Sequence, residues 1–437
     1  MALHHAFSLF LPKWFGRKLG VGASLLLVAS GAALAQTPPM SPPAAVAPSQ
    51  SAPLSLEDCL RIGRENQPSL KVAYASLAAA QYAQRGLNDI RFGARLSKEL
   101  PIRQQQSSFG VAAAAANLAQ VERDVDCSIA RMYFSVIYAR DQKKVADQIV
   151  LRLKAAVANG ETLLGKEGAP PDLNPLSVGK AKALLSQVES RVEEAKAGLQ
   201  RATAGLREAM GVGQDFPINV AEGKLPEVLP GVNKRQIIDL AMSLRGEVNQ
   251  AQNAVYITRL EVQAQDANRR VKRPTSAAGG DMHARPIPTG SFGENYIPGA
   301  IGLDFPTLFV GPREDRVQRA CETSQRAEAA LEKARNLVAL EAEDAFLRWE
   351  EAVAKIEHYK KSSSETEVLA KRALSALESG VIQSYRDVLE ILALGAQTQA
   401  YLNEAYYKHA VALTELERVT AGGFPAGAAL PRPASQP

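Results

Sequence analysis

Two very long runs of regularly spaced apolar residues constrain this chain more than any other feature. In both runs the steps are three or four residues almost throughout, which places the apolar side chains in one stripe along a helix. A single helix from Arg313 to Ser379 would be roughly 100 Å long, several times the diameter of a small domain. Such a helix needs neighbours along its whole length, so the sequence predicts coiled-coil packing and not a compact globule. The stripes are Leu118, Val121, Val125, Ile129, Met132, Val136 and Ala139 in the first run, and Leu331, Ala334, Val338, Ala345, Trp349, Ala352, Ile356 and Tyr359 in the second, where Glu341 interrupts it.

The two runs belong to two halves of the chain that follow the same order of elements. Each half opens with a short amphipathic helix that stops near Pro68 or Gly246 and is followed by a second helix. After its long helix, each half turns at a loop that contains glycine and returns along another helix. We therefore predict a mainly α chain with two tandem repeats of long coiled-coil helical hairpins. The predicted parts are a first repeat at 54–211, a connector at 212–233 and a second repeat at 234–422.

The N-terminus has the pattern of a secretory signal peptide. Lys13, Arg17 and Lys18 precede a run of apolar and small residues at 19–32, and Ala33-Leu34-Ala35 forms a cleavage site of the A-x-A type. A membrane anchor is the alternative, but it needs about 18 or more apolar residues, and this run is shorter and rich in glycine. We predict a signal peptide at 1–35, a Pro/Ala-rich linker at 36–53 and a disordered tail at 423–437.

The charge and the cysteines exclude several classes of protein. The chain has 51 Lys and Arg against 46 Asp and Glu, and the segment 1–35 holds three of the basic residues and no acidic one. The remainder is nearly neutral, which does not suggest a nucleic-acid partner. The three cysteines are far apart and form no C-x-x-C pair, so we expect buried free thiols and no metal site. They are Cys59, Cys127 and Cys321.

The histidines do not suggest an enzyme either. The sequence has no H-E-x-x-H, G-x-S-x-G, Walker or G-x-G-x-x-G motif. Of the five histidines, His4 and His5 lie in the predicted signal peptide, and His358 and His409 lie singly on predicted helices. We therefore expect no catalytic residue and no cofactor.

One segment, 274–311, breaks the helical pattern, because it is rich in Gly, Pro and aromatic residues. Around Leu303 apolar residues alternate with small or polar ones, and a period of two indicates a strand with two different faces. An apolar outward face with aromatic residues near its ends suits a membrane strand, but an edge hairpin in a soluble cap explains the alternation equally well. The candidate membrane-strand residues are Ile301, Leu303, Phe305 and Phe309.

Two motifs within this framework resemble the TolC-like outer-membrane efflux family. The stretch 302–309 has an apolar-Pro-apolar-Phe element that ends a strand, and the charged residues 313–316 follow it where the family enters a long helix. The stretch 380–390 is similar to the family's hairpin tip, a Gly followed by an Asp-Val-Leu-acid run. The resemblance covers roughly residues 54 to 422.

The resemblance implies a homotrimeric duct and not an enzyme. Three chains would form a hollow α-barrel across the periplasm, topped by a β-barrel in the lipid of the outer membrane, and substrates would pass without chemistry. The helical tips would meet a periplasmic adaptor, which joins the duct to an inner-membrane pump; the docking candidates are Gly380, Val381 and Ser384. By motif position, Asp387 and Glu390 match the acids of the pore constriction. The same two acids would also complement the dipole and supply the cap of a helix that starts near Ser384.

The first repeat departs from the family. Where the family has a hairpin of two membrane strands, this chain has only about residues 86–107, with charges on both alternating faces. Two spanning strands need about 9 to 11 residues each and a turn, so this hairpin is short or degraded. That leaves an alternative function, a structural coiled-coil protein of the periplasm without an open channel. The transported substrate and the identity of the adaptor and the pump have no signature in the sequence.

Overall fold

The computed structural model describes residues 53–90, 98–166, 169–221, 223, 225–226, 233–268, 309, 311–379 and 384–424, together with the backbone of two short strands. All of them belong to one unit of the chain, residues 53 to 437. The predicted signal peptide, nearly all of the predicted linker and most of the predicted tail lie outside the described residues.

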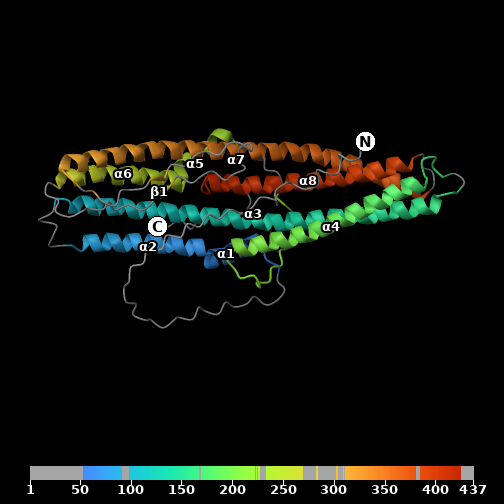
Figure 1. Ribbon diagram of the computed structural model, residues 1–437, viewed down its shortest axis with the longest axis horizontal. Helices are drawn as coiled ribbons and strands as arrows, with labels where there is room; N and C mark the ends of the chain where they lie inside the picture. Colours follow the sequence, from blue (N-terminus) through green and yellow to red (C-terminus); the bar gives the residue numbers. More distant parts are fainter. Residues whose placement is uncertain are drawn as a thin grey trace. The chain divides into compact units, whose positions relative to one another are not determined.

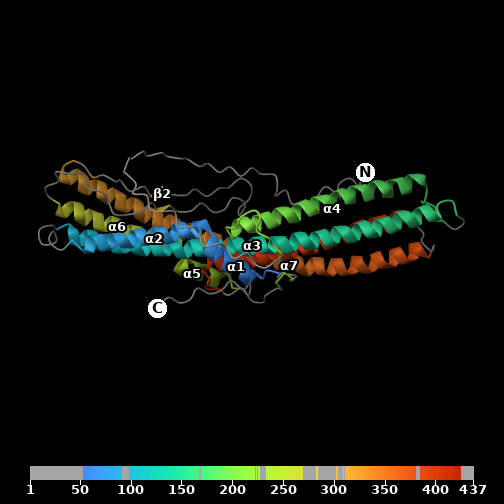
Figure 2. The same cartoon turned by 90° about the horizontal axis from the view of Figure 1, so that it is seen from below.

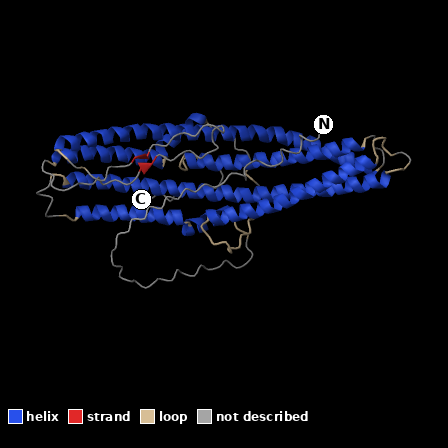
Figure 3. Ribbon diagram, in the orientation of Figure 1, coloured by secondary structure: helices blue, strands red, loops and turns tan. Residues whose placement is uncertain are grey.

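The described residues form eight helices and one pair of strands (Figure 3). In chain order they are α1 (Leu56–Asn66), α2 (Pro68–Asn88), α3 (Leu100–Leu163), α4 (Pro175–Ala209), α5 (Lys234–Leu244), α6 (Gly246–Ala267), β1 (Met282–His283), β2 (Gly302–Leu303), α7 (Arg313–Glu378) and α8 (Tyr385–Val419).

The helix lengths repeat between the two halves. α1 and α5 have 11 residues each, and α4 and α8 have 35 each. α2 has 21 residues against 22 in α6, and the long helix α3 has 64 against 66 in α7. The prediction of a mainly α chain with two tandem repeats of long helical hairpins is confirmed. α7 begins at the predicted Arg313 and ends one residue before the predicted Ser379.

The helices lie side by side in a row with four positions, which are occupied in order by α2 and α4, by α3, by α6 and α8, and by α7. α2 and α4 follow one another along α3, and α6 and α8 follow one another between α3 and α7 (Figures 1 and 2). α1 packs against α3, and α5 packs against α7. The long helices α3 and α7 therefore each have neighbours along their length. Among the described residues the row has two open edges, one formed by α2 and α4 and the other by α7.

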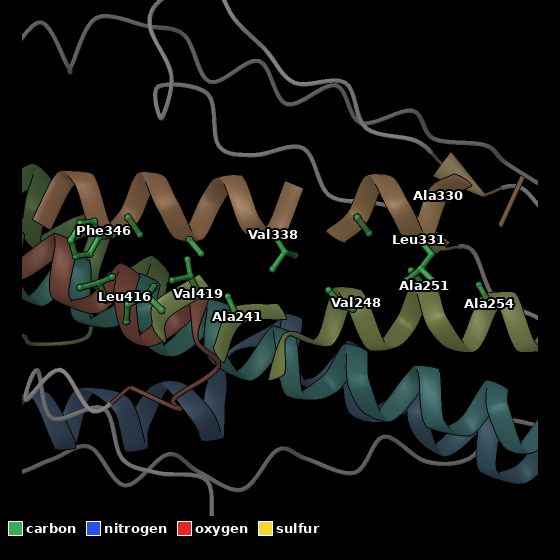
Figure 4. Close-up of a cluster of buried hydrophobic side chains, with 14 of the residues drawn as sticks. Ala241, Val248, Ala251, Ala254, Ala330, Leu331, Val338, Phe346, Leu416 and Val419 are labelled. Carbon is green, nitrogen blue, oxygen red and sulfur yellow. The ribbon is translucent and has the colours of Figure 1, made fainter. Parts of the chain in front are cut away.

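Two clusters of buried apolar side chains hold the row together. One joins α5, α6, α7 and α8, and Figure 4 shows Val338 and Phe346 of α7 beside Leu416 and Val419 of α8. The other joins α1, α3 and α4, and Ile129 of α3 is one of its fully buried members. Many of the buried positions of α7 are alanine, a side chain small enough to let helix axes approach closely along the stripe.

Local capping explains where several helices begin. Ser55 accepts a hydrogen bond from the backbone of Asp58, whose carboxylate accepts one from the backbone of Ser55, and this capping box starts α1. Where α4 ends against the start of α2, the side chain of Gln67 donates to the carbonyl oxygens of Glu208 and Ala209 at 3.2 and 2.8 Å. These bonds satisfy carbonyl groups that a helix end leaves without partners.

The matching joint in the second half, between α8 and α6, contains buried charged side chains. Arg245 takes the place that Gln67 has in the first half, and its guanidinium donates to Glu341 at 2.8 Å and to Glu247 at 2.7 Å. Arg418 of α8 donates to the other carboxylate oxygen of Glu341 and to Glu415 at 2.8 Å. Burial raises the pKa of the Glu341 carboxyl, but the two arginines outweigh it and hold that pKa below its ordinary value. Glu341, which interrupts the apolar stripe, is therefore the shared counter-charge of this joint.

The strands are short. β1 and β2 pair antiparallel, with Met282 opposite Leu303 and His283 opposite Gly302. The rest of the predicted strand segment 274–311 lies outside the described residues, apart from Phe309 and Gly311. Among the helices of the described part of the chain, none has the length and apolar character needed to cross a membrane.

We expect Glu341→Ala to lower the free energy of unfolding by about 3–5 kcal/mol, because it leaves two buried arginines without their shared counter-charge. Glu343→Ala is the matched control on the same helix. Glu343 pairs with Lys234 where both side chains are about two-fifths exposed, so this variant should lose about 1 kcal/mol or less. Denaturant unfolding followed by circular dichroism measures both, and equal losses would contradict the role of the buried joint.

Candidate functional site at the helical tips

The loops that end the two hairpins lie at the same end of the molecule. One loop connects α3 to α4 and the other connects α7 to α8, and the helix ends that flank both loops lie at the right of Figure 1. Hydrogen bonds between the two loops confirm that they are neighbours. The tips of both repeats therefore form one site.

Asp172, in the first loop, caps the first turn of α8. Its carboxylate accepts hydrogen bonds from the backbone amides of Tyr385 and Arg386, both at 2.9 Å, and from the hydroxyl of Ser384 at 3.0 Å. Burial raises the pKa of the Asp172 carboxyl, but these hydrogen bonds outweigh it and hold that pKa below its ordinary value. The amides at a helix N-terminus carry partial positive charge, so an ionised carboxylate stabilises them. The first hairpin thus holds the end of the second.

Ser384, a predicted docking residue, is the N-cap of α8. Its hydroxyl oxygen accepts a hydrogen bond from the backbone amide of Asp387 at 3.2 Å while the hydroxyl donates to Asp172. Ser384 is therefore partly buried within the chain by a structural contact, and its side chain connects both loops.

Tyr385 forms a second link between the hairpins. Its side chain is fully buried, and its hydroxyl donates to the backbone oxygen of Ala156 in α3 at 2.9 Å. The ring lies against Gly160, where an added Cβ would be only 2.7 Å from the hydroxyl oxygen, so only glycine leaves room for it. Burial raises the pKa of the Tyr385 phenol to about 12, so the hydroxyl stays protonated and able to donate.

The candidate constriction residues Asp387 and Glu390 lie on the first two turns of α8, and both are exposed in the single chain. They are three positions apart, which places them on one side of the helix. Within the described part of the chain, no hydrogen bond or ion pair involves either carboxylate. The capping that Asp387 was expected to share is supplied by Ser384 and Asp172. Both carboxylates are thus available to solvent, to ions or to another chain.

Most of the remaining predicted residues lie outside the part of the chain that the structure describes. Gly380, Val381, Ile301 and Phe305 lie outside the described residues, and of Leu303 only the backbone in β2 is described. Phe309 is described and is fully buried within the single chain. The roles of these residues in docking or in the membrane stay predictions.

No pattern in the sequence points to Asp172, Ala156 or Gly160. Asp172 lies in the loop before α4, two residues before Asn174, which forms its own capping box at the start of that helix. Its partners at the start of α8 are more than 210 positions away, so nothing local identifies it as the cap of another helix. Within the described residues there is also no group of three or more His, Cys, Asp or Glu side chains arranged to hold a metal ion.

Comparison with known proteins identifies the fold. No protein-family profile matches the sequence, and no curated protein matches it at the sequence level. Several solved structures match over most of the chain. The outer-membrane channel OprN matches with a TM-score of 0.66 at 15% identity, over 84% of this chain and 90% of its own.

Two more channels match in the same way. The Campylobacter jejuni CmeC outer-membrane channel matches with a TM-score of 0.63 at 13% identity, over 84% of this chain and 86% of its own. The Neisseria gonorrhoeae MtrE outer-membrane channel matches with a TM-score of 0.62 at 14% identity, over 84% of this chain and 89% of its own. At these identities the similarity establishes a shared fold.

We expect Asp172→Ala to speed hydrogen exchange at the amides of Tyr385 and Arg386 by roughly twofold to thirtyfold, because a lost helix cap costs about 0.5–2 kcal/mol. Mass spectrometry of peptides from the start of α8 measures this exchange. Asp387→Ala is the control, since the Asp387 carboxylate bonds to neither amide among the described residues. Equal exchange in both variants would show that Asp172 does not hold the tips together.

Proposed function

We propose that this chain, which has the TolC-like fold of outer-membrane channels, is the outer-membrane duct of a tripartite efflux or type I secretion system. The observation that carries the proposal is the fold itself, two repeats of helical hairpins with 64- and 66-residue helices whose tips meet at one end. A duct is passive, so this function needs no catalytic residue and no cofactor. The protein would lie in the outer membrane and extend into the periplasm.

The two open edges of the helix row support a ring of identical chains. The edge formed by α2 and α4 exposes large apolar side chains, and so does the edge formed by α7. Two different edges of one chain make a head-to-tail contact between copies, and such contacts close into rings when the rotation permits. We propose a homotrimer in which α7 of one copy packs against α2 and α4 of the next. The exposed residues are Val72, Tyr74, Tyr82 and Leu176 in α2 and α4, and Leu347, Val368 and Leu369 in α7.

Asp387 and Glu390 would line the narrow end of this ring. Their carboxylates are exposed and unpaired among the described residues, and three copies would bring six of them together around the axis. Such a ring of acids favours cations and lets charge repulsion or divalent ions affect opening. The links from Asp172 and Tyr385 would set how far the tips stand apart.

The partners follow from the same tips. The loop between α7 and α8, with Gly380, Val381 and Ser384, is the proposed docking surface for a periplasmic adaptor, which would connect the duct to an inner-membrane pump. The specificity for a substrate would then come largely from the pump. No feature of the described residues selects among drugs, metal ions and polypeptides.

One observation bears on the alternative, a structural periplasmic coiled coil without a channel. The connection between α2 and α3 is residues 89–99, eleven positions, whereas that between α6 and α7 is residues 268–312, forty-five positions. Only the second is long enough for two spanning strands of about 9 to 11 residues each. The fold shared with outer-membrane channels favours the duct.

Single-channel recording in planar bilayers tests the proposal. We expect the membrane-extracted protein to give cation-selective steps, and we expect Asp387→Asn/Glu390→Gln to reduce the selectivity and change the block by divalent cations, because the acids would line the narrowest part. Glu57→Gln/Glu65→Gln removes two exposed acids from α1, away from the tips, and should behave as the parent.

Two results would contradict this account. A well-folded oligomer of the parent that never inserts or conducts would favour the structural alternative. A tip variant with the same selectivity as the α1 variant would exclude Asp387 and Glu390 from the constriction.

A further inference from the structure

α6 ends at Ala267 and α7 begins at Arg313, and one buried side chain bonds to the described residues on both sides of the connection between them. Arg316 lies in the first turn of α7 and is only 2% exposed. Its Nη2 donates to the carbonyl oxygen of Asn268 at 2.8 Å, and its Nε donates to the carbonyl oxygen of Gly311 at 3.2 Å. Asn268 directly follows α6, and Gly311 lies two residues before the start of α7. The two residues that flank the segment 269–310 therefore bond to one guanidinium.

Arg316 is also tied to the first repeat. Its Nη1 donates to the side-chain oxygen of Gln265 at 2.5 Å, and the amide nitrogen of Gln265 donates to Glu261 at 2.6 Å. The carboxylate of Glu261 in turn accepts from Arg103 at the start of α3. A buried guanidinium is stable only when its donors are satisfied and its charge is balanced. The neutral side chain of Gln265 thus joins Arg316 to the Glu261 carboxylate by two hydrogen bonds.

The first repeat has no connection of comparable length at this end. Its connection between α2 and α3 spans eleven positions, and the carboxylate of Glu99, at the end of that connection, accepts hydrogen bonds from Arg103 and from the side chain of Asn268. The chain is thus already bonded to the helix row at Glu99. Of the two repeats, only the second has a long segment at this end, and Asn268 lies at its base.

We propose that Arg316 is the positioning residue for the segment 269–310: it holds together the two flanking residues, Asn268 and Gly311, as a neck, so that the segment enters the outer membrane as one unit. This inference rests on the proposed function for its membrane step. An arginine suits the role because its rigid, planar fork reaches three acceptors in different directions at once. Arg313 adds a second link to Asp266 of α6, but this ion pair is largely exposed and contributes less.

Limited proteolysis of the membrane-extracted full chain tests the neck directly. Trypsin sites at Arg269, Arg270 and Lys272 follow Asn268 immediately. Arg316→Met keeps the aliphatic stem and removes the donors, and we expect cleavage at these sites to become roughly tenfold faster, because losing buried hydrogen bonds raises the population of the opened neck. Arg319→Met is the matched control, one turn along at an exposed position. Arg316→Lys, which keeps the charge, should be intermediate.

Two further readouts separate positioning from general stability. The proposal predicts that Arg316→Met keeps the helical circular dichroism and the oligomer of the parent but forms channels at least about tenfold less often in planar bilayers, since an open neck misplaces the inserted segment. Cleavage at the parent rate would overturn the proposal, and so would a loss of helical signal across the whole chain. A parent without channels would count against the proposed function alone, because the cleavage comparison still decides the neck.

Discussion

Helices of more than sixty residues have to be covered along their whole length, and this constraint shapes the rest of the structure. A helix of this kind gains little from its own backbone hydrogen bonds in water and depends on packing for its stability. The chain meets the requirement by duplication, because each long helix is covered by pairs of shorter helices that follow one another end to end. The apolar stripes of α3 and α7 are buried because the shorter helices pack against them.

Covering a long helix with two short ones creates joints, where helix ends with unpaired backbone groups are brought into the protein. The chain solves the two joints differently. At the open edge of the row, the neutral Gln67 caps α4. Between α3 and α7, where the joint is enclosed, the contacts join charged side chains, because Arg245 and Arg418 share Glu341. The hairpin tips and the neck of the segment after α6 resemble the Gln67 joint, since at each of them a single side chain bonds to two backbone groups.

The long-range polar contacts mark the limit of what the sequence predicts. The spacing of apolar residues suffices for the number and order of the long helices, because helical periodicity is a local property. The role of Glu341 is not local, since its partners are 96 and 77 positions away, and it shows only as an interruption of a stripe. The contacts of Asp172 and Arg316 cannot be predicted from the sequence for a similar reason, because their partners belong to other elements. Asp387 and Glu390 were found by motif, and their exposure is compatible with the role assigned to them.

In the ring that we propose, copies of this chain surround a lumen, with the α7 edge of one copy against the α2 and α4 edge of the next. Electron microscopy of the full chain extracted from membranes tests this ring. We predict particles with threefold symmetry and an open lumen that narrows toward the end where the hairpin tips lie. Monomers, or oligomers whose helices pack into a solid bundle without a lumen, would contradict it.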